Sequence, residues 1–292
     1  YEGEGADNVP LLASHNLITR VALYVLRVNG LNSFPLGTHV HVKNPIPLGR
    51  GLGSSGAAVV AGVMLANELG GLELSKQRML ELVGNLKTSL GEHIQNLAWM
   101  SDATKSKAME KLSAFTVKVG YPDTWKDYSG IIIDPKKSYW ENVKSASIFH
   151  VKDSNEKCGK PVDKAEWGMT PQTVNAYYNP STNEICFPAG ILQAPFFSPD
   201  ALDCDNYGAI GVVIGHEMTH GFDDNGRQFD KDGNMEDWWT KDDAEMFDSL
   251  ANKLKAQFDK IVVIDSLHAN GKLTLGENIA DQGGLRVAYT AY

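Results

Sequence analysis

The residues that could most clearly carry out chemistry are those of the run His216-Glu217-Met218-Thr219-His220. Residues four apart lie on one face of a helix, about 6 Å apart along its axis, so both imidazoles can bind one metal ion. A zinc ion in a hydrolytic site takes three protein ligands and a water molecule, and a nearby carboxylate accepts the proton of that water. The spacing therefore favours a zinc hydrolase over two surface histidines on an amphipathic helix.

A helix must hold these residues, and the flanking sequence predicts one. Asp205 or Asn206 can cap a helix that runs from Tyr207 to Phe222. The turns before His216 are apolar nearly all round, which indicates a buried helix. A buried His-Glu-His cluster without a metal would be costly.

A third ligand is expected from a second helix, which opens at Gly276–Asp281 and carries Glu277 and Asp281 on one face. One carboxylate can complete the metal site, while the other fixes the tautomer of a histidine. Taken alone, such a pair is more often a solvated helix face. The pair indicates a metal site only in combination with the two histidines.

A separate candidate site is a glycine-rich loop, residues 49–56, between a strand predicted at Thr38–Val42 and a helix predicted over residues 57–69. Glycines allow positive φ and close backbone approach, and a capping serine can present N–H groups to an anion. The loop has neither the P-loop nor the dinucleotide-binding pattern, so phosphate binding and a plain capped turn are equally favoured. The residues that would hold a phosphate are Gly49, Gly51, Gly53, Ser54 and Ser55.

Composition excludes several classes of protein. The 292 residues include 36 acidic and 27 basic side chains, and a net charge of -9 argues against a nucleic-acid partner. No long apolar window or export signal is present, which predicts no membrane-spanning segment. Three cysteines leave at least one without an intrachain partner, and the compartment stays open.

The composition changes along the chain. No Asp or Glu occurs between Asn8 and Asn67, whereas every tryptophan and cysteine lies at or beyond Trp99. We place the boundary near residue 80. It falls inside a predicted helix whose apolar positions recur every three or four residues from a cap at Ser75 to Leu97.

The second part, about residues 81–292, resembles the neprilysin family of zinc metallopeptidases. The strings that carry the resemblance occur in the family's order and are Asn175–Tyr178, Phe187–Gln193, Gly215–Gly226, Asp237–Trp239 and Gly276–Asp281. The resemblance implies a mainly helical, thermolysin-like catalytic domain. It implies that His216, His220 and Glu277 bind one zinc ion, that Glu217 is the general base, and that Asp281 orients a zinc histidine.

The resemblance also implies how a peptide substrate binds. Asn175 and the carbonyl of Ala176 would hold the peptide backbone, and Asp223 or Asp224 would brace His220. An apolar pocket for the residue after the scissile bond would be lined by Ile191, Phe196, Val212 and Val213. In the family a His and an Arg stabilise the transition state well beyond position 281, where this sequence has only 11 residues. We therefore expect a C-terminally truncated domain with weak zinc endopeptidase activity.

The first part, about residues 1–80, resembles homoserine kinase of the GHMP kinase superfamily, through Pro47–Ala58 and its flanks. This resemblance implies a Mg-ATP phosphate loop, with Ser55 near the magnesium ion. The alternatives to the peptidase are therefore a homoserine kinase or a non-catalytic chimera of two fragments. The kinase resemblance suggests the cytoplasm and the peptidase resemblance an extracytoplasmic or periplasmic location, so localisation stays open.

The expected fold class is α+β. A small α+β first part should precede a mainly helical second part with strands at Thr116–Val119, Val174–Tyr178 and Glu184–Phe187. The strand that contains Asn175 should form a sheet edge along the cleft, to which an extended peptide can add.

Overall fold

The computed structural model describes residues 2–3, 12, 14–28, 31–44, 58, 61–62, 65–66, 69 and 74–292. It divides the chain into two units. The first unit comprises the described residues of 1–73 together with Pro122–Gln172, and the second comprises Leu74–Tyr121 and Thr173–Tyr292. The predicted phosphate-binding residues, Gly49 to Ser55, lie outside the described residues.

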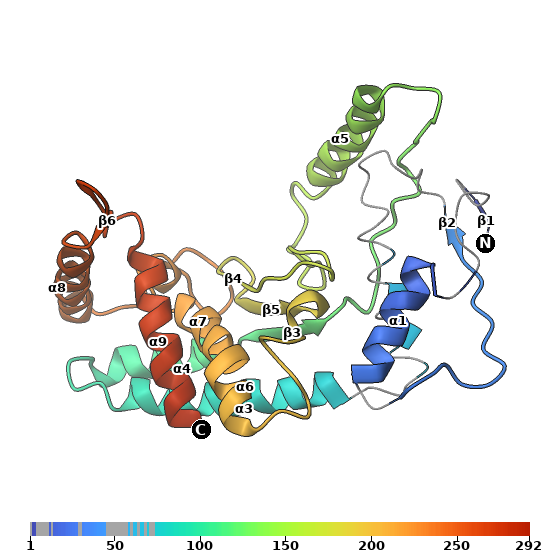
Figure 1. Ribbon diagram of the computed structural model, residues 1–292. Helices are drawn as coiled ribbons and strands as arrows, with labels where there is room; N and C mark the ends of the chain where they lie inside the picture. Colours follow the sequence, from blue (N-terminus) through green and yellow to red (C-terminus); the bar gives the residue numbers. More distant parts are fainter. Residues whose placement is uncertain are drawn as a thin grey trace. The chain divides into compact units, whose positions relative to one another are not determined.

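Among its described residues, the first unit contains two short paired strands and two long helices (Figure 1). Strand β1 (Glu2–Gly3) pairs in parallel with β2 (Lys43–Asn44), and the helices are α1 (Leu17–Val28) and α5 (Tyr139–Glu156). The strand predicted at Thr38–Val42 is wrong, because β2 begins only at Lys43. The alternation there has no buried face to support it, since Val40 is 36% exposed.

Helix α1 has one buried face. Ile18, Ala22 and Leu26 recur at steps of four and are buried, and the last two pack against Ala66. Ala66 belongs to the helix predicted over residues 57–69, whose described residues are all helical. Helix α5 begins at a capping box in which Ser138 and Glu141 bond each other's backbone N–H.

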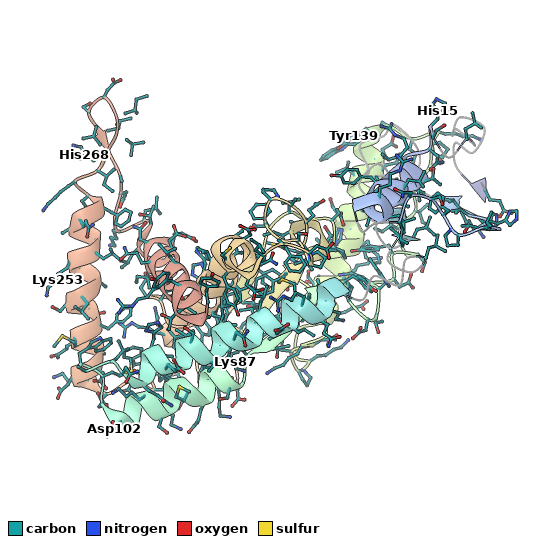
Figure 2. All side chains as sticks on the ribbon, turned by 60° about the horizontal axis from the view of Figure 1, so that its bottom comes forward. His15, Lys87, Asp102, Tyr139, Lys253 and His268 are labelled. Carbon is teal, nitrogen blue, oxygen red and sulfur yellow. The ribbon has the colours of Figure 1, made fainter. Side chains whose placement is uncertain are left out.

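The second unit is mainly helical, as expected. Its helices are α3 (Leu74–Gln95), α4 (Asp102–Ser113), α6 (Asp203–Asn206), α7 (Val212–His220), α8 (Lys241–Phe258) and α9 (Leu275–Ala291). Short 3-10 turns are η2 (Ala189–Ile191) and η4 (Gly226–Gln228), and η3 (Tyr207–Gly211) is a π-helical turn. Helices α3 and α4 lie side by side, and Figure 2 labels Lys87 on the first and Asp102 at the start of the second.

A three-stranded sheet accompanies these helices, in the order β3-β5-β4. Strand β3 (Thr116–Gly120) runs parallel to β5 (Glu184–Pro188), and β4 (Tyr177–Asn179) pairs antiparallel with β5 at the edge. The strands predicted at residues 116–119 and 184–187 are confirmed to within one residue. A separate hairpin is formed by β6 (Val262–Ile264) and β7 (Leu267–His268).

The strand predicted at Val174–Tyr178 is displaced toward the C-terminus. The register pairs Tyr177 with Cys186, so continuing it backward would place Asn175 opposite Pro188. Proline has no backbone N–H to donate, and the ladder ends before it. Asn175 and Ala176 therefore precede the edge strand and do not belong to it.

The core of the second unit is built on α3. Six of its predicted apolar positions are buried: Met79, Leu82, Val83, Leu86, Leu90 and Ile94. The helix begins at Leu74 and ends at Gln95, so the predicted periodicity is confirmed and Leu97 lies just beyond the last turn. The change in composition near residue 80 thus falls within one continuous helix.

The helix predicted from Tyr207 to Phe222 is confirmed in its central part, but its start is earlier. The helical backbone begins at Asp203, with Leu202 in the N-cap position. Asp205 and Asn206 are therefore not caps. The Asn206 side chain instead donates to the Ser198 carbonyl at 2.7 Å and accepts the Ser198 N–H at 3.1 Å.

Among the described residues, no helix combines the length and apolar character needed to cross a membrane. The three cysteines form no disulfide: Cys186 is buried, whereas Cys158 and Cys204 are exposed.

Candidate metal centre

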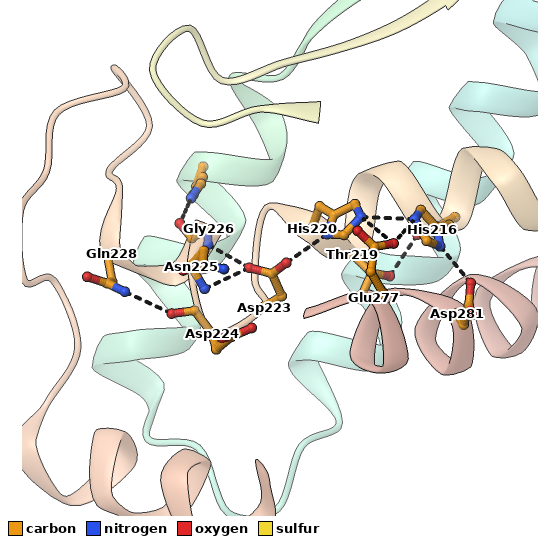
Figure 3. A network of polar contacts seen from close by, with 12 residues as sticks. His216, Thr219, His220, Asp223, Asp224, Asn225, Gly226, Gln228, Glu277 and Asp281 are labelled. Atoms are coloured by element: carbon orange, nitrogen blue, oxygen red, sulfur yellow. Dashed lines mark hydrogen bonds and ion pairs between the residues drawn. The ribbon is translucent and has the colours of Figure 1, made fainter. Parts of the chain in front are cut away.

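Helices α7 and α9 lie close together at the predicted site (Figure 3). Glycines make this approach possible. A Cβ added at Gly284 of α9 would lie 2.6 Å from two backbone atoms of α7, the nitrogen of His216 and the oxygen of Val212. A Cβ at Gly215 of α7 would lie 2.8 Å from the Gly284 oxygen. Larger residues would hold the two helices apart.

The close approach brings three ligand atoms together. The Nε2 atoms of His216 and His220 are 2.9 Å apart, and Glu277 Oε2 lies 3.3 Å from the first and 3.7 Å from the second. Ligand atoms 2.0–2.1 Å from a tetrahedral zinc ion lie about 3.3 Å from one another. The three atoms therefore fit three corners of one tetrahedron, and two imidazoles with a carboxylate are a donor set that zinc prefers.

Glu217 is the second carboxylate near the histidines. Its ligand atom and those of His216 and His220 lie within 4.8 Å of one another. Glu277 is the better candidate for the third ligand, because its oxygen lies 3.3 and 3.7 Å from the two imidazoles and its side chain is 67% exposed. Glu217 is only 7% exposed and accepts a hydrogen bond from the Tyr178 backbone, which places it as a neighbour of the metal position.

Each histidine is oriented by an aspartate at its other ring nitrogen. His216 Nδ1 lies 2.8 Å from Asp281 Oδ1, and His220 Nδ1 lies 2.7 Å from Asp223 Oδ2. A carboxylate at Nδ1 favours the tautomer that leaves Nε2 free to bind a metal. The sequence left Asp223 and Asp224 as equal candidates for bracing His220; it is Asp223 that makes the contact.

Burial and charge act together on the pKa values at this site. Burial raises the pKa of Glu217, and the positive charges that His216 and His220 can carry oppose that shift. For His220, burial alone would lower the pKa, but the hydrogen bond to Asp223 and its negative charge raise it. A carboxylate with a raised pKa is the better proton acceptor near neutral pH.

The residues that carry the three candidate ligand atoms line a cleft of about 450 Å³. Asn175 and Ala176 line this cleft together with the His216, Glu217, His220 and Glu277 side chains. Two predicted backbone-binding residues thus lie on the same cleft as the proposed metal ligands. The cleft is also lined by β4, because Tyr177 and Tyr178 face it.

The four residues predicted to form an apolar pocket do not line this cleft. Ile191 is buried in the core, and Phe196, Val212 and Val213 are half-buried against it. The segment that carries Phe196 is tied to the π-helical turn before α7 by a hydrogen bond from the Ile210 N–H to the Phe196 carbonyl. The structure therefore gathers these side chains in or against one core.

Sequence reasoning missed the turn Asp223–Gly226 that fixes His220. The backbone N–H groups of Asn225 and Gly226 donate to Asp223 Oδ1 at 2.9 and 2.6 Å. A Cβ at Gly226 would lie 1.8 Å from the His220 carbonyl oxygen, so only glycine fits there. The Asp-Asp-Asn-Gly sequence is a turn signal that could have indicated this arrangement.

Two family models match the chain. Both describe peptidase family M13, one over residues 64–122 and the other over residues 175–292. Residues 64–122 and 175–292 belong to peptidase family M13. The match over residues 64–122 begins within the segment that resembles homoserine kinase. The match over residues 175–292 includes all of the metal-site residues described above.

Relatives and solved structures agree with this family. An endothelin-converting enzyme homolog from Locusta migratoria is 43% identical over 75% of this chain, and neprilysin-3 from Drosophila melanogaster is 42% identical over 75%. The crystal structure of the Mycobacterium tuberculosis zinc metalloprotease Zmp1 with an inhibitor is similar over 79% of this chain, with 45% identity and a TM-score of 0.71. PepO from Lactobacillus rhamnosis is similar over 80%, with 34% identity and a TM-score of 0.71.

The matched region is a part of each relative. This M13 chain covers 31% of the Locusta protein, 28% of the Drosophila protein, 37% of the Zmp1 chain and 39% of the PepO chain. It therefore spans about a third of the length of the relatives that it matches.

Proposed function

We propose that this M13 chain is a zinc-dependent endopeptidase that hydrolyses oligopeptides. The observation that carries the proposal is the convergence of His216 Nε2, His220 Nε2 and Glu277 Oε2 at distances of 2.9 to 3.7 Å. A zinc ion bound by these atoms would supply a Lewis acid that lowers the pKa of water and polarises a carbonyl.

The remaining roles belong to the chain's own residues. Glu217 accepts the proton of the attacking water and holds it on its carboxylate until the leaving amine takes it. Its raised pKa suits this exchange. Asp281 and Asp223 keep the imidazoles of His216 and His220 in the metal-binding tautomer.

The proposed substrate is an extended peptide that lies in the cleft beside β4. The Asn175 side chain and the Ala176 carbonyl would hydrogen-bond the peptide backbone, which is supported by their place on the cleft wall. The preference for an apolar residue after the scissile bond, with Ile191, Phe196, Val212 and Val213 as its pocket, comes from the resemblance to neprilysins. This preference is tested by comparing kcat/KM for two peptides that differ only in carrying Leu or Asp at that position. The Leu peptide should have the higher value.

The experiment that tests the function compares the full chain with three variants. The unmodified chain should contain about one zinc ion and cleave a fluorogenic peptide. Glu217→Gln should keep its zinc and lose turnover, whereas His216→Ala should lose both. His268→Ala is the matched control, because this histidine lies on the exposed hairpin at β7 and should change neither measurement.

Two results would contradict the proposal. One is a cooperatively folded chain that takes up no zinc when the ion is supplied. The other is a Glu217→Gln variant that cleaves the peptide as fast as the unmodified chain.

The phosphate-binding interpretation of Gly49–Gly56 stays a prediction of the sequence, as does the division of the chain near residue 80. Calorimetric titration of the full chain with Mg-ATP tests the first directly. Heat that saturates with nucleotide would support a kinase-like loop, and its absence would leave the peptidase as the proposed function.

A further inference from the structure

A buried lysine supports the turn behind the metal centre. Lys111 lies near the end of α4 and is only 1% exposed. Its Nζ atom donates to the carbonyl oxygens of Gly226 and Phe229 at 2.6 and 2.7 Å. Both acceptors belong to the segment that follows Asp223.

The surroundings of the ammonium group are aromatic. Nζ lies 5.7 Å from the ring centre of Phe222 and 5.9 Å from those of Tyr178 and Trp238. Burial lowers the pKa of Lys111 to about 7, and the charges of Asp223 and Asp230 oppose this shift. A methionine would fill the same space without the cost of burying an amine, so the two carbonyl contacts are what the lysine adds.

These contacts connect to His220 through a short chain of hydrogen bonds. Lys111 holds the carbonyl of Gly226, and the N–H of the same residue donates to Asp223 Oδ1 at 2.6 Å. Asp223 Oδ2 in turn bonds His220 Nδ1 at 2.7 Å. The turn also packs directly on the His220 carbonyl, where only a glycine fits.

We propose that Lys111 is a positioning residue of the metal centre. By holding the Gly226 and Phe229 carbonyls, Lys111 fixes the Asp223–Gly226 turn, so that Asp223 keeps His220 ready to bind the metal. The inference rests on the proposed zinc site. It assigns to α4 a part in metal binding, although this helix contributes no ligand.

The test measures zinc affinity in the absence of substrate. Zinc dissociation constants of the full chain and of Lys111→Met are determined by competition with a chromophoric chelator. The Co²⁺ absorption spectrum of each protein reports the ligand geometry, and thermal unfolding of the metal-free proteins reports folding. Loss of residues that orient metal ligands typically weakens metal binding about 10- to 100-fold, and we expect about tenfold for Lys111→Met because it acts through Asp223.

The matched control is Lys87→Met. Lys87 also donates to a backbone carbonyl, that of Ser113 at 2.9 Å, and burial also lowers its pKa, but it lies on α3 and its hydrogen bond goes to α4 and not to the turn. It should leave zinc affinity and the Co²⁺ spectrum unchanged. If Lys111→Met does not fold, Lys111→Leu, which also removes both carbonyl contacts, is measured in its place.

The outcomes separate this inference from the proposed function. If the unmodified chain folds but binds no zinc, the proposed function and this inference both fail. If the unmodified chain binds zinc and the folded Lys111 variant binds it equally well, only the role of Lys111 is overturned. An equal loss of affinity in Lys87→Met would also overturn it, because the effect would then be general destabilisation.

Discussion

Replacing Gly284 with alanine tests whether the spacing of α7 and α9 sets zinc affinity. The new Cβ would lie 2.6 Å from the His216 nitrogen and the Val212 oxygen, about 0.8 Å inside an ordinary contact of 3.4 Å. Both neighbours are backbone atoms within a helix, so they cannot rotate away. The helices must separate, or the backbone must bend.

The geometry of the metal centre gives the size of the effect. A separation of 0.8 Å directed along the ligand contacts would place Glu277 Oε2 about 4.1 Å from His216 Nε2 and about 4.5 Å from His220 Nε2. Metal sites tolerate about 0.2 Å of error in ligand distances. We therefore expect zinc binding to weaken about 100-fold, which is about 2.7 kcal/mol.

The assay is chelator competition at neutral pH, with unfolding of the metal-free protein measured in parallel. Gly84→Ala is the control, because a Cβ at that position on α3 meets nothing within 4 Å. It should leave zinc affinity unchanged and raise helix stability by up to about 1 kcal/mol. A folded Gly284→Ala protein with the zinc affinity of the unmodified chain would refute the reasoning.

Three further predictions follow from contacts in the second unit. Asp281→Ala should weaken zinc binding about tenfold through the loss of the His216 Nδ1 contact, as chelator competition would show. Asp243 is buried, which alone would raise its pKa, but hydrogen bonds from Ser101, Thr104 and Thr240 lower the pKa to about 2. Because the folded pKa lies below the ordinary 3.8, this group contributes about 2 kcal/mol of stability above pH 3.8 that is lost as the pH falls toward 2. Urea unfolding should show Asp243→Asn less stable than the unmodified chain at pH 6, with the gap closing in acid, and a constant gap would contradict this assignment. Leu86→Ala should cost about 2–5 kcal/mol of unfolding free energy, whereas Leu80→Ala, at a position 44% exposed, should cost far less.

The local geometry of the metal centre could be predicted from spacing alone. Two histidines four apart must face the same way on a helix, and their Nε2 atoms are 2.9 Å apart. Glu277 follows His216 by 61 residues in the sequence. Its position therefore depends on how α9 packs against α7. The resemblance to neprilysins supplied that long-range contact, and the Gly215–Gly284 approach is its physical basis in the structure.

Other features could not be predicted because they depend on tertiary partners. Asn206 is a good capping residue by type, yet its side chain bonds the Ser198 backbone, and the helix begins at Asp203. The edge strand begins after Asn175 because the register would place Asn175 opposite Pro188, which has no N–H to donate. The alternation of residues within one strand does not reveal its register with a partner strand. No sequence pattern singled out Lys111, and only the fold shows that it is buried.

The π-helical turn η3 also lay beyond sequence reasoning. It occupies Tyr207–Gly211, immediately before the helix that carries both histidines. A π-helical turn contains one more residue than an α-helical turn, so it shifts the phase of everything upstream relative to His216. The apolar pattern from residue 207 onward continues smoothly through the turn and gives no sign of the shift.

The continuity of α3 across residue 80 limits how this protein can be dissected. A fragment that starts at residue 81 would discard Met79 from the core and begin in the middle of a helix. A truncation at Leu74 would keep every turn of that helix, together with its contacts to α4, α7 and α9. Expression trials that compare these two starting points would therefore report on helix integrity before they report on catalysis.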